Sequence, residues 1–129
     1  MKHWCLILSL FALSSQAANP TYIDIENRNS LKTIYGSASD KVNDSLDDNE
    51  FFIHNKSLEY SFTSVTDGSI VKWDGPGTTL SGKVVIILTE VISDKMMCKT
   101  FTQSIVIKGT TFEGKGVACI VDNKWQVKQ

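Results

Sequence analysis

The sequence has almost no excess of either charge, since 13 Lys and Arg stand against 14 Asp and Glu among its 129 residues. Without a net positive field the chain has nothing to attract phosphate, which argues against a nucleic-acid partner. It also lacks an apolar run of the roughly 20 residues that span a bilayer, which argues against a transmembrane anchor. The 42% hydrophobic and 21% charged residues nevertheless suit one small globular domain.

Histidine and the common catalytic and metal-binding motifs are equally scarce. The chain has two histidines, and His54 is the one outside the first few residues. The sequence contains no G-x-S-x-G, H-E-x-x-H or C-x-x-C motif, and the acidic run at 44–50 lacks the alternating pattern of a calcium loop. We therefore predict a protein that is not an enzyme and has no metal or cofactor. His54 is expected to be a solvated residue of a helix, although a general base paired with distant acids is the alternative.

Residues 1–17 are typical of a secretory signal peptide. Lys2 begins the segment, Trp4–Leu13 is apolar, and Ser15-Gln16-Ala17 supplies the small residues of a cleavage site. The single cysteine of this segment, Cys5, lies at the front of the apolar stretch and not at the cleavage site, so we expect no lipid anchor. The sequence thus predicts export to the periplasm or the cell surface.

Three cysteines are an odd number, and removal of Cys5 would leave Cys98 and Cys119. If Lys108-Gly109 forms a two-residue hairpin turn, the register places Cys98 directly opposite Cys119. Two cysteines in an exported protein most often form a disulfide bond. A catalytic or metal-binding pair is the less favoured alternative, and a bulge at residues 114–116 would shift the register by one.

The remaining chain divides into an arm and a domain. Residues 18–46 are weakly patterned and are expected to form a partly ordered N-terminal arm. Residues 47–129 begin with a helix at about 48–64, capped by Asp47 or Asp48 with Glu50 in its first turn. Five strands follow, at Ser69–Trp73, Lys83–Ile92, Met97–Ile107, Thr110–Val121 and Lys124–Lys128.

These elements predict an α+β fold, in which a small and mostly antiparallel meander of about five strands packs on one helix. The continuous apolar run Val84–Leu88 predicts a central strand with both faces covered. Face alternation along the cysteine hairpin predicts that Phe101 and Ile105 are buried, whereas Thr100 and Thr102 are partly solvated.

Two kinds of residue are candidates for a binding surface. Trp73 and Trp125 are either contact aromatics or core residues, and core packing is the more common use. Asp74 and the pair Lys108-Gly109 lie in predicted turns, which would protrude from the sheet.

Several residues of the chain form an ordered pattern of glycine, tryptophan and cysteine positions, namely Gly68, Trp73-Asp74-Gly75-Pro76, Gly82, Cys98-Lys99-Thr100-Phe101, Gly116-Val117-Ala118-Cys119 and Trp125. In this pattern, residues 46–127 resemble the rickettsia-type surface-antigen domain, the seventeen-kilodalton antigen family of bacterial envelope proteins. The resemblance implies an exported, envelope-associated domain. Family members often carry a lipobox cysteine and a glycine-zipper membrane segment ahead of the domain, and this sequence shows neither.

Together these features predict a non-enzymatic, surface-antigen-like protein of the envelope or periplasm, which binds a partner or supports the cell surface. The expected partner is an envelope component or another protein. The alternative is a small secreted inhibitor of an enzyme such as lysozyme, because a rigid protruding turn loses little entropy on binding.

Overall fold

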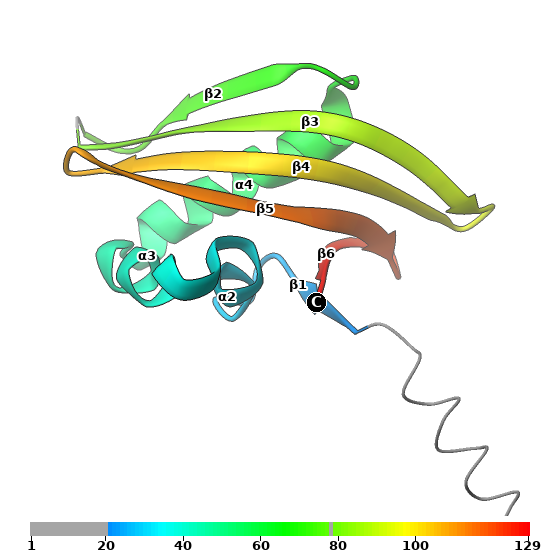
Figure 1. Cartoon of the computed structure of the whole chain (residues 1–129), viewed down its shortest axis with the longest axis horizontal. Coiled ribbons are helices and arrows are strands. Elements are labelled where there is room, and N and C mark those ends of the chain that lie inside the picture. Colours follow the sequence, from blue (N-terminus) through cyan, green and yellow to red (C-terminus); the bar gives the residue numbers. More distant parts are fainter. Residues whose placement is uncertain (1–20, 78) are drawn as a thin grey trace, which may run out of the picture.

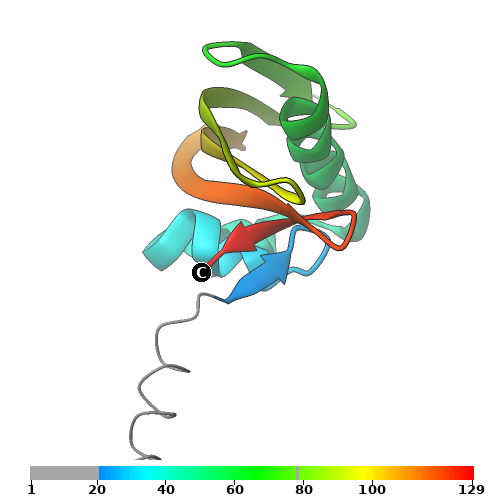
Figure 2. The ribbon, with the colours of Figure 1, turned by 90° about the vertical axis from the view of Figure 1, so that its right-hand side faces the viewer.

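The computed structural model describes residues 21–77 and 79–129, so the predicted signal peptide at 1–17 lies outside the described residues. One antiparallel sheet of six strands, in the order β1-β6-β5-β4-β3-β2, curls around the long helix α4 (Figures 1 and 2). The elements are β1 (Tyr22–Asp24), α2 (Ser30–Tyr35), the 3-10 turn η1 (Gly36–Ala38), α3 (Ser39–Ser45), α4 (Asp48–Ser64), β2 (Ile70–Asp74), β3 (Leu80–Ser93), β4 (Met96–Ile107), β5 (Thr110–Val121) and β6 (Lys124–Lys128). The predicted α+β class is confirmed, with six strands where about five were expected.

Helix α4 begins at a complete capping box. The Asp47 carboxylate accepts from the Glu50 N–H at 2.8 Å, and the Glu50 carboxylate accepts from the Asp47 N–H at 2.9 Å. These two bonds satisfy backbone donors that the first turn leaves without intrahelical partners. The buried face of the helix carries Phe51, Leu58 and Phe62, as the apolar spacing predicts. The ring of Phe62 packs 4.9 Å from that of Phe101, which joins the helix to the centre of the sheet.

The cysteine hairpin has the predicted register. Lys108 and Gly109 both have positive φ, at 49° and 83°, as a two-residue hairpin turn requires. Pairing then continues without a shift from Ile107–Thr110 to Cys98–Cys119, where the two cysteines form a disulfide bond. The bulge considered at residues 114–116 is absent from this pairing. The predicted face alternation is also confirmed, because Phe101 and Ile105 are fully buried and Thr100 and Thr102 are half-buried.

The described part of the expected N-terminal arm, residues 21–46, is an integral part of the fold. Strand β1 pairs with β6, and the short helices α2 and α3 bury Leu31, Ile34 and Val42 in the core. The expectation of a partly ordered arm is therefore wrong for these residues. Each helix is too short to show the period that identifies a long amphipathic helix, and Gly36, at φ 58°, separates them. Strand β6 pairs only with the last four residues of β5, Ala118–Val121. Helix α2, in place of a strand, lies beside the preceding part of β5.

The apolar run of β3 is not covered on both faces, which corrects the prediction made from its continuity. Val84 and Ile86 are fully buried, whereas Ile87 and Leu88 are 52% and 46% exposed. Strand β2 pairs with β3 from Ser81 to Val85, and a register irregularity follows between Ile86 and Leu88. The buried core includes Val84 and Ile86 of this strand, and the apolar residues beyond this point lie outside it and are exposed to solvent.

Candidate functional site

The two tryptophans proposed as contact aromatics take part in core packing. Trp125 is 8% exposed, and its indole N–H donates to the Thr63 hydroxyl at 3.0 Å, which ties β6 to α4. Trp73 is half-buried and its ring lies over Gly82, where a β-carbon would overlap the indole. The structure therefore does not bring Trp73 and Trp125 together on one exposed surface.

The turn residues proposed for the same surface do lie near one another. Asp74 ends β2, and Lys108-Gly109 joins β4 to β5 at the same end of the sheet (Figure 1). The N–H of Lys108 donates to the carbonyl of Thr79 at 2.8 Å, so the two turns are held together by a backbone hydrogen bond. Asp74, Lys108 and Gly109 are all exposed. They form a small polar end of the molecule.

His54 lies in the core, so the prediction of a solvated histidine is wrong. Its ring is fully buried, with Nε2 2.8 Å from the Tyr35 hydroxyl and Nδ1 3.2 Å from Asn55 Oδ1. Phe51 stacks on it, and Trp73 meets it edge-on at 6.0 Å between ring centroids. Burial lowers the pKa of His54 to about 4, and burial also raises the pKa of Tyr35. At neutral pH this ring is therefore an uncharged hydrogen-bonding core residue.

Further buried polar atoms accompany His54. Gln103 is fully buried beside Tyr35, and neither its Oε1 nor its Nε2 makes a hydrogen bond of full geometry with a described residue. The indole nitrogen of Trp73 is in the same situation. Polar groups left in this way cost stability.

The feature that the sequence analysis missed is an exposed apolar stretch of β3. The β3 apolar segment, residues 87–92, carries Ile87, Leu88, Val91 and Ile92, and Val91 and Ile92 are 74% and 59% exposed. Asp67 accepts hydrogen bonds from the backbone N–H and the hydroxyl of Thr89, so this carboxylate satisfies the β3 backbone donor at Thr89, beyond the end of the pairing with β2. Beyond Thr89 the edge is open, and clustered apolar side chains at such an edge are typical of an interaction surface. The apolar run was visible in the sequence, but its exposure depends on where β2 ends.

The fold and these sites define a small, disulfide-bonded α+β domain with an apolar strand edge. Comparisons with protein-family models, with curated proteins and with solved structures found no match for the chain. Within residues 21–77 and 79–129, no helix is long and apolar enough to cross a membrane. The same part of the chain holds no group of three potential metal-ligating side chains.

Proposed function

We propose that this chain is an exported, non-enzymatic protein of the bacterial envelope that binds a partner protein through the β3 apolar segment. The observation that carries the proposal is the exposure of Ile87, Leu88, Val91 and Ile92, four large apolar side chains within residues 87–92 of one strand. Removing such side chains from water on binding contributes about 25 cal/mol per Å² of apolar surface.

Three features support the envelope location. The Cys98–Cys119 disulfide suits an oxidising compartment outside the cytoplasm. Residues 1–17 have the composition of a signal peptide. The resemblance to the rickettsia-type surface-antigen domain, with its paired cysteines and terminal tryptophan, implies the same location.

The experiment expresses the full chain in bacterial cells and separates periplasm, envelope membranes and medium. We expect the protein in the envelope fraction with both cysteines resistant to alkylation until a reductant is added. The double variant Val91→Lys and Ile92→Lys should move into the soluble periplasmic fraction, because two charged groups would have to be buried at the interface.

Ile70 provides the matched control, since it is 58% exposed on β2, outside the β3 apolar segment. Ile70→Lys should stay in the envelope fraction, and circular dichroism should show that both variants are folded. Cytoplasmic retention of the full chain, or an unchanged distribution of the double variant, contradicts the proposal.

A second candidate function, a secreted inhibitor of an enzyme such as lysozyme, is favoured by the β4–β5 turn. Lys108 and Gly109 are exposed at its tip and are held by the hairpin register on both sides. A preformed turn of this kind enters a cleft with little loss of conformational entropy. A lysozyme assay with the oxidised protein at micromolar concentration tests it, and full residual lysozyme activity rejects this candidate.

A further inference from the structure

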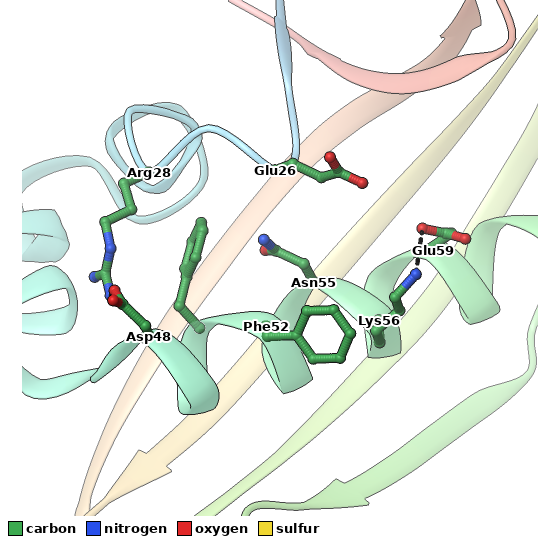
Figure 3. Close-up of a pocket in the computed structure, with 8 residues that line it drawn as sticks. Glu26, Arg28, Asp48, Phe52, Asn55, Lys56 and Glu59 are labelled. Atoms are coloured by element: carbon green, nitrogen blue, oxygen red, sulfur yellow. Dashed lines mark hydrogen bonds and ion pairs between the residues drawn. The ribbon is translucent and has the colours of Figure 1, made fainter.

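A groove runs along α4 on the side that faces the segment between β1 and α2 (Figure 3). Its first part encloses about 440 Å³, and a second part of about 360 Å³ continues toward the β5–β6 turn. Glu26, Lys56 and Glu59 line both parts, so the two form one elongated groove. This volume lies in the range of small-ligand sites.

Asn55 is the polar side chain that the fold positions most firmly in this groove. The residue is 7% exposed, and its Oδ1 lies 3.2 Å from Nδ1 of the buried His54. An amide oxygen can only accept, so the Nδ1 that faces Asn55 Oδ1 carries the proton of the neutral ring, and Nε2, 2.8 Å from the Tyr35 hydroxyl, is left as the acceptor of that hydroxyl. Nδ1–H then donates to Asn55 Oδ1. The amide N–H groups of Asn55 therefore point toward the groove, where they have no partner among the described residues.

The charged side chains of the groove are mostly neutralised by one another. Arg28 pairs with Asp48 at 3.1 Å, and its other donors bind carbonyls and the amide oxygen at the end of α3. Lys56 pairs with Glu59 at 3.6 Å. Lys124 pairs with Asp24 at 3.8 Å. The Glu26 carboxylate, on the wall opposite α4, has no partner in the described chain and is available as an acceptor (Figure 3).

An aromatic surface completes the groove. Phe52 lines it and is 57% exposed. Asn55 thus offers donors, Glu26 offers an acceptor and Phe52 offers an apolar face. A ligand complementary to these three side chains needs a hydrogen-bond acceptor for the Asn55 amide and a hydrogen-bond donor for the Glu26 carboxylate. It also needs an apolar surface of C–H groups to pack against the Phe52 ring. Sugars that carry acetamido groups have all of these.

We propose that this groove binds an N-acetylated oligosaccharide, with an acetamido or hydroxyl group between Asn55 and Glu26 and a ring against Phe52. A cationic peptide suits the groove less well, because the Lys56 ammonium already lies 5.4 Å from the centroid of the Phe52 ring. Lys124 adds a second positive charge in the other part. The site goes beyond the partner-protein surface on β3 and does not depend on it.

The experiment titrates the soluble tetramer of N-acetylglucosamine into the isotope-labelled chain that begins at residue 18, and follows backbone amides by NMR. We expect saturable shifts at residues 24–28 and 48–63. Phe52→Ala and Asn55→Asp should each weaken binding about tenfold, because one removes the apolar face and the other removes the amide donors.

Tyr60→Ala is the matched control, since Tyr60 is 56% exposed on the same helix and is not among the side chains that line the groove. Its affinity should equal that of the parent chain. Glu26→Gln keeps an acceptor and should bind the sugar, and a tri-lysine probe should give no saturable shift with either chain. No saturable shift with the sugar, equal weakening by Tyr60→Ala, or binding of tri-lysine alone overturns the proposal. None of these outcomes alters the fractionation result that tests export.

Discussion

At the residue scale, His54 makes the stability of the molecule dependent on pH. Its pKa is about 4 in the fold and about 6.5 in the unfolded chain, because the buried ring has no water to solvate its charged form. As the pH falls below 6.5, His54 therefore becomes protonated in the unfolded chain at a higher pH than in the folded chain. The free energy of unfolding is therefore unaffected by protonation of His54 above pH 6.5. It decreases by about 3 kcal/mol as the pH falls from 6.5 toward 4.

Urea unfolding measured from pH 4 to pH 8 checks this prediction. The contribution of His54 is isolated by comparing the parent with His54→Gln, which does not titrate. The difference in unfolding free energy between the two proteins should change by about 3 kcal/mol across the range. A constant difference would show that His54 does not carry the pH dependence.

The burial of His54 could have been recognised from sequence spacing, whereas its partners could not. His54 lies three residues after Phe51 and four before Leu58, on the face that the apolar pattern assigns to the core. Its hydrogen bond to Tyr35 joins α4 to α2, a helix in the segment that the sequence predicted to be only partly ordered. Long-range pairs of this kind follow from the packing of several elements, so a local pattern does not contain them.

At the element scale, a two-residue turn determines a whole hairpin. Once Lys108-Gly109 is known, strict alternation and the ladder of hydrogen bonds fix every pair as far as the cysteines, so this register was predictable. The neighbouring strand β3 was not, because its exposure is set by the length of β2 and by the irregularity after Ile86. Neither has a strong signature in the sequence.

The disulfide that closes this hairpin should stabilise it mainly by restricting the unfolded chain. Its cysteines are 21 residues apart, and a loop of that size corresponds to about 3 kcal/mol in the chain-entropy treatment. Replacement of both cysteines by serine should lower the free energy of unfolding by about that amount and leave the sheet in place.

Chemical denaturation of the parent and of Cys98→Ser with Cys119→Ser, each with and without reductant, measures this effect. Reductant should weaken the parent to the level of the double variant and leave the variant unchanged. Equal midpoints for all four samples would mean that the bond adds no stability to the fold.

At the scale of the whole molecule, residues 21–46 supply one side of the core. Ile25, Leu31, Ile34, Tyr35 and Val42 are all at most 5% exposed, and Leu46 is 3% exposed. At roughly 1.5–3 kcal/mol for each buried side chain, the six contribute about 9–18 kcal/mol before the entropy of ordering this segment is subtracted. That is comparable with the entire net stability of a small domain, about 5–15 kcal/mol.

The boundary at residue 47, which the sequence favoured, should therefore not yield a stable fragment. A chain of residues 47–129 should lose its near-ultraviolet circular dichroism and its cooperative thermal transition, because Phe51 and His54 would be uncovered along α4. A chain that begins at residue 21 should retain both properties. If the shorter fragment melts cooperatively near the melting temperature of the longer one, the helices α2 and α3 are not required for the core to fold. If it does not, the domain begins at β1, whose pairing with β6 completes the sheet.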